Sequence, residues 1–389
     1  MNQRHDLVVI GAGVVGAACA YFASRAGLDV LVLDRGPVAG GTSSRGEGNL
    51  LVSDKEAGPE LDLAKLSQSV WRGPLAEFGH LWEFHDKGGV VVASSEGAAR
   101  SLRALSAEQR DRGVRAVDID AADLPEYEPY LSPELVGGTY YPDDAQVQPM
   151  LAAAHLLRLT RERGATVRTG AEVTGISKDG DRVTGVHTSD GGIDAPAVLN
   201  AAGTWASSIA AMAGVDVPVL PRRGFVLVTE PLPVTVRHKV YAAEYVQDVA
   251  SSDSGLQTSP VIEGTDGGTI LIGSSRERVG FDDTVSVPVL RSLATKAIEI
   301  FPALAGVAVM RHYHGFRPYC PDHLPVIGPD PRAPGLWHAC GHEGAGVGLA
   351  AGTGALIAQA LTGEATSLDL APFAPERFEA ASIGSERAT

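Results

Sequence analysis

The pattern of apolar and polar positions opens with a strand, a helix and a second strand. Asp6–Ile10 is a short, largely apolar run that ends at a glycine, and Asp29–Leu33 is a second such run that ends at Asp34. Continuous apolar runs of this length are typical of strands buried on both faces of a parallel sheet. Between them, small and apolar residues recur at helical spacing over Val14–Arg25, and a glycine follows. The start of the chain therefore predicts a β-α-β unit.

The same two periodicities predict the remaining elements. Apolar residues at helical spacing indicate helices at residues 60–78, 96–112, 148–163, 287–301 and 346–361. Short β-rich runs indicate strands at residues 90–93, 166–168, 172–177, 182–188, 195–200, 224–230, 239–242, 269–272 and 335–339. Asp179-Gly180 and Gly191-Gly192 are turn pairs, so we expect a small antiparallel meander between residues 166 and 200. The strands from residue 224 to residue 272 are expected in a second sheet.

This order of elements predicts an α/β fold class with two domains, an α+β arrangement. A Rossmann-like, doubly wound domain would carry an inserted antiparallel-sheet domain that binds substrate. We assign residues 1–80, 145–215 and 315–376 to the Rossmann-like domain. Residues 81–144 and 216–314 are assigned to the substrate domain, and residues 377–389 to a polar tail.

Composition narrows the classes of partner. The chain has 389 residues and a formal net charge of −15, which disfavours nucleic acid and anionic membrane surfaces as partners. Its three cysteines, Cys19, Cys320 and Cys340, have no CxxC spacing, which suits a reducing compartment. Apolar runs are broken by charged or turn residues, so no membrane span is predicted. We therefore expect a cytoplasmic protein without a metal site.

Three glycines after the first strand match the opening turn of a dinucleotide-binding fold. Gly11 permits the tight turn, Gly13 lets a pyrophosphate approach the backbone, and Gly16 lets the helix pack on the strand. The helix N-terminus, with Val14 and Val15, offers N–H groups and a partial positive charge to phosphates. Asp34, at the end of the second strand, can accept hydrogen bonds from ribose hydroxyls. An adenine dinucleotide is predicted, and these residues leave open whether it is NAD or FAD.

A second glycine-rich segment, residues 341–346, stands near the other end of the chain and opens the last helix. A simple nicotinamide dehydrogenase needs only one such turn. A protein that holds a long, two-ended cofactor against a substrate could use both. A further glycine-rich stretch at residues 40–49 is too long for a simple turn and is expected beside the first glycine turn.

Four motifs in this order resemble the D-amino-acid-oxidase-like family of flavoenzymes. The family includes glycine oxidase, sarcosine oxidase and the catalytic subunits of bacterial hydroxyproline and opine dehydrogenases. The motifs are the Gly11–Gly16 turn with Asp34-Arg35, the stretch Asn200-Ala201-Ala202-Gly203-Thr204-Trp205, Gly315-Phe316-Arg317-Pro318 with Pro321-Asp322, and Gly341-His342 with Gly344 and Gly346. The resemblance covers nearly the whole chain.

The resemblance implies FAD as the cofactor. Asp34 and Arg35 would hold the adenosine ribose, Thr42 and Ser43 would face the pyrophosphate, and Val173 would present its backbone to adenine. The segment from Gly344 to Val347 would face the flavin, where a helix N-terminus stabilises the negative charge of the reduced ring. The full set of implied cofactor contacts is Gly11, Gly13, Val14, Val15, Gly16, Asp34, Arg35, Gly41, Thr42, Ser43, Val173, Ala202, Gly203, Trp205, Arg317, Gly344, Ala345, Gly346 and Val347.

The resemblance also implies the substrate side of the site. Arg317 would clamp an amino-acid carboxylate, because a guanidinium binds a carboxylate through two parallel hydrogen bonds. Tyr241 and Tyr245 are expected either at the roof of the pocket or in the core. His342 is expected either to contact the flavin site or to cap the last helix. The attachment cysteine of covalent family members would fall near Gly315 instead of at Cys320, so non-covalent FAD is expected.

The implied reaction is oxidation of the C–N bond of a small amino acid: a D-amino acid, glycine or sarcosine, or a proline-like imino acid. Hydride would pass from Cα to flavin N5, giving an imine and then a 2-oxo acid. The stretch from Gly46 to Asp54 resembles the β subunits of hydroxyproline and opine dehydrogenases, so the electron acceptor would be oxygen or a partner protein or quinone. Either electron acceptor is compatible with a homo- or a hetero-oligomer. A non-catalytic, flavin-binding assembly subunit is the alternative from another class.

Overall fold

A parallel sheet forms from the apolar runs at both ends of the chain and in its middle. The computed structural model describes residues 3–246 and 253–378. Within them, the sheet brings strands from three distant parts of the sequence side by side. All its neighbours run parallel except the edge pair β19–β20. In sheet order the strands are β19 (Val326–Pro329), β20 (Leu336–Cys340), β13 (Ala197–Asn200), β2 (Leu7–Ile10), β3 (Val30–Asp34) and β9 (Thr166–Thr169).

The two faces of this sheet bury alternate residues of each strand. Leu7 and Val9 of β2 join a core with helices on one face, whereas Val8 and Ile10 join a second core on the other face. This burial on both sides explains why the strands are apolar throughout. The helices of the first core are α1 (Val14–Arg25), α2 (Pro59–Arg72), α5 (Pro149–Glu162) and α9 (Gly346–Thr362).

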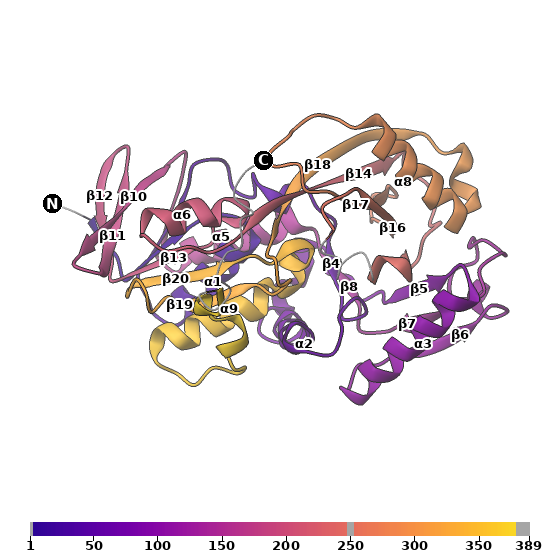
Figure 1. The fold of residues 1–389 in the computed structure, drawn as a ribbon, viewed down its shortest axis with the longest axis horizontal. Coiled ribbons are helices and arrows are strands. Elements are labelled where there is room, and N and C mark those ends of the chain that lie inside the picture. The colour runs from indigo at the N-terminus through magenta and orange to yellow at the C-terminus, as the bar shows by residue number, and fades with distance from the viewer. Residues whose placement is uncertain (1–2, 247–252, 379–389) are drawn as a thin grey trace.

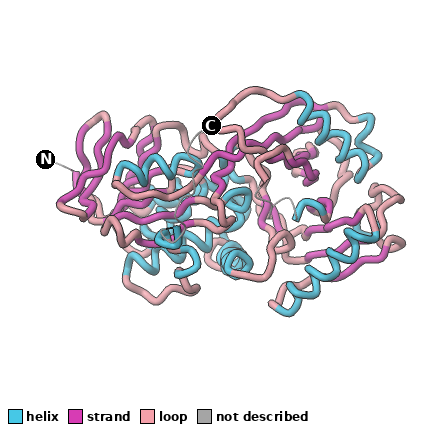
Figure 2. Tube along the Cα trace, in the orientation of Figure 1, coloured by secondary structure: helices cyan, strands magenta, loops and turns pink. Residues whose placement is uncertain are grey.

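The other face is covered by a small sheet and a short helix. The small sheet has the order β1 (Gln3–Arg4), β12 (Gly191–Asp194), β11 (Arg182–Thr188) and β10 (Val173–Asp179), and the helix is α6 (Ala206–Met212). Figure 1 shows β10, β11 and β12 at the left end of the molecule, beyond the parallel sheet. The chain thus has three layers here, and Figure 2 shows the helices gathered beneath the strands.

An eight-stranded, mostly antiparallel sheet forms the other half of the molecule. Its strands in order are β18 (Val309–Tyr319), β14 (Leu220–Thr229), β17 (Ile270–Arg276), β16 (Gln257–Gly264), β15 (Lys239–Ala242), β5 (Gly89–Ala93), β7 (Gly137–Tyr141) and β6 (Val117–Asp120). One face packs on α8 (Val287–Ile300) and α4 (Leu124–Tyr127). The opposite face contributes Val91, Tyr241 and Val261 to the core of the helices. That shared core joins the two halves.

The remaining elements complete the junction and the rim. A two-stranded ladder of β4 (Asn49–Leu50) and β8 (Ala145–Gln146) lies between the two halves. Helix α3 (Glu96–Asp111) begins with a capping bond from Ala98 N–H to Ser95 Oγ and lies at the far right in Figure 1. Short 3-10 helices occupy Thr42–Ser44, Ala76–Trp82, Gly203–Trp205, Pro302–Gly306, Glu343–Ala345, Ala371–Phe373 and Pro375–Phe378.

Helix α9 with its preceding turn, Glu343–Thr362, is long and apolar enough to cross a membrane, a feature that the sequence analysis did not anticipate. However, 61% of its most apolar window is buried inside the protein. Leu349, Ala350, Leu356 and Ile357 belong to the core that α9 shares with α1. We therefore interpret α9 as a core helix.

Most predicted elements are present within one to three residues, and three predictions were wrong. Residues 166–169 and 197–200 are strands of the parallel sheet and take no part in the meander. Gly191-Gly192 is not a turn, because β12 starts at Gly191 and the turn falls on the two residues before it. Nine strands of the described residues were missed: β1, β4, β6, β7, β8, β12, β16, β18 and β19. Within β18 the first four residues, Val309 to His312, are all exposed, two apolar residues followed by two polar ones, so no apolar alternation marks this part of the strand.

The predicted boundary at residue 315 falls inside β18, which pairs with β14 from Val309 to Tyr319. The segment that carries Arg317 is therefore a strand of the eight-stranded sheet. The predicted polar tail lies, apart from its first two residues, outside the described residues.

The close packing of α9 on α1 provides a test of the fold. A Cβ at Gly354 would lie 2.7 Å from the backbone carbonyl of Ala18. We expect Gly354→Ala to lower the free energy of unfolding by about 1–3 kcal/mol, because backbone atoms cannot move aside cheaply. Gly97→Ala, at an exposed position of α3, is the matched control and should leave stability unchanged or raise it by up to about 1 kcal/mol. Urea unfolding followed by circular dichroism measures both. Equal stability of the two variants would contradict this packing.

Candidate active site

One cavity joins the two glycine segments from opposite ends of the chain. It has a volume of about 380 Å³ and lies between the carboxyl ends of β2, β3 and β13, the N-terminus of α9, and strands β14 and β18. Of the residues predicted from the sequence, its wall contains Gly11, Gly13, Val14, Val15, Asp34, Arg35, Gly41, Thr42, Ser43, Val173, Ala202, Gly203, Trp205, Tyr245, Arg317, His342, Gly344, Gly346 and Val347. Gly16, Tyr241 and Ala345 are not part of this wall.

The first glycine turn brings backbone close to backbone. Gly11 has a φ of 120°, and a Cβ at Gly16 would lie 2.1 Å from the carbonyl oxygen of Gly11. Gly16 thus acts by allowing α1 to approach the strand, without lining the cavity. Helix α1 has no side-chain cap and no acidic residue in its first turn. The N–H group of Val14 donates to Oγ of Ser43 at 3.0 Å, and the N-terminal partial charge of α1, where Gly13 and Val14 line the cavity, suits a phosphate.

Asp34 and Arg35 close one end of the cavity. The two carboxylate oxygens of Asp34 accept hydrogen bonds from the N–H groups of Ala12 and Gly36, at 2.7 Å each. These bonds fix the carboxylate and leave further lone pairs for hydroxyl donors. The Arg35 guanidinium lies 4.4 Å from the ring centroid of Trp205, a cation–π contact. The Asp34 carboxylate and the stacked Arg35–Trp205 pair at this end of the cavity suit a ribose and the groups next to it.

The N-terminus of α9 lies toward the other end of the cavity, and a buried ion pair shapes it. Glu343 has a φ of 46°, in the left-handed region, and its Oε1 lies 2.6 Å from Nη1 of Arg222. Burial opposes ionisation of Glu343, but the hydrogen bond from His323 and the charge of Arg222 lower its pKa to about 2. The carboxylate therefore stays charged and holds the turn in place, while Gly344 and Gly346 line the cavity.

His342 bonds inward, to the helix that it precedes. Its Nε2 lies 3.0 Å from Oγ1 of Thr353, and the side chain is 3% exposed. Burial lowers the pKa of His342 to about 3, so the ring is neutral. The residue lines the cavity, and its polar contact within the described residues is the one to Thr353.

Arg317 extends from β18 into the cavity wall. Its Nη1 donates to the carbonyl oxygen of Ser275 at 2.7 Å, and its Nη2 donates to Oγ of Ser274 at 3.1 Å. A Cβ at Gly224 would lie 2.0 Å from Nη1, so the glycine provides the space for this guanidinium. Burial, together with the nearby charge of Arg276, lowers the pKa of Arg317 to about 10, so it remains a cation at neutral pH.

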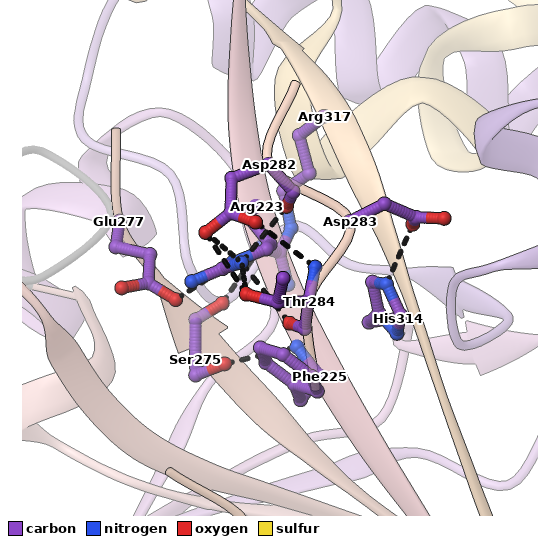
Figure 3. A network of polar contacts seen from close by, with 9 residues as sticks. All are labelled: Arg223, Phe225, Ser275, Glu277, Asp282, Asp283, Thr284, His314 and Arg317. Atoms are coloured by element: carbon purple, nitrogen blue, oxygen red, sulfur yellow. Dashed lines mark hydrogen bonds and ion pairs between the residues drawn. The ribbon is translucent and has the colours of Figure 1, made fainter. Parts of the chain in front are cut away.

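A polar network behind Arg317 fixes the neighbouring strands, as Figure 3 shows. Arg223 on β14 pairs with Glu277 at 2.9 Å and with Asp282 at 2.9 Å. His314 on β18 pairs with Asp283 at 2.7 Å. Arg223 is therefore occupied by structural contacts.

The two predicted tyrosines differ in their positions. Tyr245 lines the cavity, and its ring centroid lies 5.0 Å from that of Tyr241 in an edge-to-face contact. Tyr241 lies behind it, fully buried, with its hydroxyl donating to Ser53, which in turn donates to Asp144. Burial raises the pKa of Tyr241 well above its usual value. Tyr241 therefore supports Tyr245 from behind the wall.

The sequence analysis missed several residues of the cavity wall, above all Glu47, Asn49 and Gly224. Glu47 stands in the glycine-rich stretch of residues 40–49, which was expected beside the first glycine turn. Its place near the cavity could therefore have been predicted from the sequence. Gly224 carried no signal, because only the tertiary position of Arg317 explains it.

The cysteines lie in the core or at its edge. Cys19 and Cys320 are fully buried and outside the cavity wall. Gly315 does line the cavity, and a Cβ there would lie 2.4 Å from Cβ of Arg45. A thiol at position 315 is thus absent, and non-covalent cofactor binding stays a prediction.

A parallel sheet with a glycine turn, a second, mostly antiparallel sheet, and one cavity that reaches the N-termini of α1 and α9 fit a flavin-dependent oxidoreductase. The comparisons with known proteins agree. Residues 6–360 match the DAO family, described as FAD dependent oxidoreductases, and the chain belongs to this family.

Relatives match over nearly their whole length. The chain is 32% identical to the glycine oxidase of Pseudomonas putida over 95% of this chain and 98% of the relative. It is 29% identical to the hydrogen cyanide synthase subunit HcnC of Pseudomonas aeruginosa, over 97% of each chain. The crystal structure of glycine oxidase from Geobacillus kaustophilus superposes with a TM-score of 0.88 at 27% identity, covering 98% of this chain and 100% of that chain.

The residues present fit FAD, which is the cofactor of this protein. The N-terminus of α1 suits the pyrophosphate, and Asp34 suits the ribose at one end. Helix α9 also begins without a side-chain cap, and no acid lies in its own first turn. Its N-terminus suits the flavin ring, which becomes more negative on reduction. The individual contacts remain proposals.

Replacing Asp34 tests the adenosine end. We expect Asp34→Ala to weaken FAD binding by about 10- to 100-fold, because a charged acceptor bond contributes roughly 1.5–3 kcal/mol. Asp29→Ala is the matched control, since Asp29 stands at the start of the same strand and bonds His5 at the exposed surface. Flavin fluorescence on titration of the apoprotein with FAD measures both dissociation constants. An unchanged constant for Asp34→Ala would exclude the assigned role.

Proposed function

We propose that this FAD-dependent oxidoreductase oxidises the C–N bond of a small amino acid. The candidates are D-amino acids, glycine or sarcosine, and proline-like imino acids. The observation that carries the proposal is the half-buried Arg317 guanidinium in the wall of the cavity that takes FAD. The glycine oxidases among the relatives support the same class of substrate.

Arg317 determines how such a substrate would lie. Ser274 and Ser275 hold two of its nitrogens, and the guanidinium remains charged at neutral pH. A carboxylate bound there would fix the position of the neighbouring Cα–H. When bound, FAD supplies the two-electron acceptor for that C–H bond. The product imine hydrolyses to a 2-oxo acid, or stays cyclic when the substrate is proline-like.

Tyr245 shapes the same end of the cavity. Its ring centroid lies 4.8 Å from Cζ of Arg276, a cation–π contact, and 5.0 Å from the ring centroid of Tyr241, an edge-to-face contact. Both contacts hold the ring rigidly, so Tyr245 limits the size of the substrate side chain. This supports a small amino acid over a large amine. We keep His342 as a neutral cavity residue whose contact with FAD is a proposal.

Substrate-induced bleaching of the flavin tests the proposal. The FAD-loaded protein is mixed without oxygen with glycine, sarcosine, D-amino acids and D-hydroxyproline, and the visible flavin absorbance is followed. At least one amino acid should reduce the flavin. If none does, the alternative of a non-catalytic, flavin-binding assembly subunit gains support.

Replacement of Arg317 tests the carboxylate clamp. We expect Arg317→Lys to lower kcat/KM for that amino acid by about 10²- to 10⁴-fold, because one ammonium cannot reproduce the planar, two-bond contact. Flavin should stay bound. Arg311→Lys, at an exposed position of the same strand, is the matched control and should keep wild-type turnover. Unchanged turnover by Arg317→Lys would exclude the clamp.

A second candidate function concerns the electron acceptor. The stretch from Gly46 to Asp54 resembles the β subunits of hydroxyproline and opine dehydrogenases, and one relative is named a subunit of hydrogen cyanide synthase. Both support a catalytic subunit that passes electrons to a partner protein or quinone within a hetero-oligomer, in the cytoplasm.

Reoxidation kinetics separate the two acceptors. If a partner is the acceptor, the reduced isolated protein should reoxidise slowly in air-saturated buffer and rapidly with an artificial quinone. Stopped-flow absorbance of the flavin measures both rates. Rapid peroxide formation by the isolated protein would contradict the subunit function and indicate an oxidase.

A further inference from the structure

The same cavity wall holds a half-buried acid, Glu47, whose Oε1 is fully buried and which the proposed reaction does not yet use. We propose that Glu47 receives the ammonium group of the substrate and takes one proton from it, so that Arg317 and Glu47 together bind a zwitterion. This inference rests on the proposed function and names a further catalytic residue.

The backbone on both sides of Glu47 is fixed. Arg45 Nη1 donates to the carbonyl oxygen of His314 at 3.1 Å, and the hydroxyl of Tyr313 donates to the carbonyl oxygen of Gly46 at 3.2 Å. On the other side, the carbonyl oxygen of Gly48 accepts a bond from Val147 N–H at 3.0 Å. The loop is therefore attached to β18 and to the segment before α5, and Glu47 is placed between these anchors.

The chain provides space for the carboxylate as it does for Arg317. A Cβ at Gly273 would lie 2.5 Å from Oε1 of Glu47, just as a Cβ at Gly224 would collide with the guanidinium of Arg317. Consecutive residues of β17 serve both head groups. Gly273 bonds Glu47 through its backbone, whereas Ser274 and Ser275 hold Arg317. One strand thus sets an anion and a cation side by side at the cavity.

Glu47 has unused acceptor capacity. Its Oε1 is buried and has no hydrogen-bond donor among the residues that the structure describes. Lys239 interacts electrostatically with Glu47, but its ion pair is with Glu263. A buried carboxylate oxygen without a donor is unfavourable, and a substrate ammonium group would supply the missing bond.

The charges around Glu47 come from four strands. Lys239 on β15, Arg276 on β17 and Arg317 on β18 are cations, Glu263 on β16 is an anion, and the phenols of Tyr245 and Tyr313 also face it. Burial raises the pKa of Glu47, and the three cations oppose this shift only in part. A carboxylate with a raised pKa accepts a proton more readily, as a base requires.

The proton step balances without any redox change. One N–H bond of the substrate ammonium breaks, and one O–H bond forms on Glu47. The amine nitrogen keeps the electron pair, which would then be available to form the C=N bond when the substrate is oxidised at Cα, with bound FAD as the two-electron acceptor. Substrate enters as the abundant zwitterion instead of the scarce neutral amine, so the enzyme works well below the pKa of the free amine.

The test compares the pH dependence of flavin reduction in three FAD-loaded proteins: wild type, Glu47→Gln and Glu47→Asp. At pH 7, Glu47→Gln should reduce flavin about 100-fold more slowly with the amino acid that reduces the wild type. The defect should shrink by about tenfold per pH unit as the free amine becomes neutral in solution. Glu47→Asp keeps a carboxylate and should keep the wild-type shape of the profile at a lower rate.

Glu277→Gln is the matched control. Glu277 directly follows strand β17. In this variant Arg223 still pairs with Asp282, so the pH dependence of flavin reduction should match that of the wild type. A second readout needs no turnover. Acetate has a carboxylate but no amine, so raising the pH should weaken its binding to the wild type as Glu47 ionises. Its binding to Glu47→Gln should be tighter and independent of pH. The change in flavin absorbance on titration with acetate measures the acetate dissociation constant of both proteins.

The outcomes are distinct. A pH-independent defect in Glu47→Gln, or acetate binding equal to that of the wild type, overturns the assignment of Glu47 while amino-acid oxidation stands. If no amino acid reduces the wild-type flavin, the proposed function fails and this assignment fails with it.

Discussion

The site depends on one half-buried cation, Arg317, at the junction of the two sheets. Its guanidinium occupies space that any side chain at position 224 would fill, and it bonds the neighbouring strand through Ser274 and Ser275. An arginine that is partly withdrawn from water is costly unless hydrogen bonds and an anion satisfy it. Strand β17 supplies these hydrogen bonds. Glu47 in its loop and Glu343 in the turn before α9 supply negative charge near the guanidinium.

The same requirement joins the two halves of the molecule. Arg222 lies directly opposite Arg317 in the β14–β18 ladder and pairs with Glu343 at the start of α9. The eight-stranded sheet is thereby bonded to the turn that faces the flavin end of the cavity. In the proposed assignment, substrate contacts come from the sheet and cofactor contacts from the helix N-termini, so the Arg222–Glu343 ion pair would help to set their relative position. A precise distance between substrate carbon and cofactor is what such chemistry needs.

The sequence predicted the parallel sheet well, because strands buried on both faces are apolar throughout and the glycine turn has a physical reason at each position. Residues of both glycine-rich segments line one cavity, but Gly16 and Ala345 do not, and the cofactor contacts of these segments stay predictions. Strand β18 was missed because its exposed first half lacks apolar alternation. The roles of Gly224, Gly273 and Glu47 depend on contacts between distant strands. Spacing along the chain does not show that Gly224 leaves room for Arg317 or that Gly273 leaves room for Glu47. The individual site contacts stay predictions.

The central claim is that this cavity positions the Cα–H bond of an amino acid for transfer of hydride to FAD. The most direct measurement is the rate of anaerobic flavin reduction with an amino acid carrying deuterium at Cα, compared with the ordinary amino acid. The account predicts reduction by at least one amino acid and a severalfold slower rate with deuterium. Absence of flavin reduction by every amino acid, in a protein with full FAD content, would contradict it.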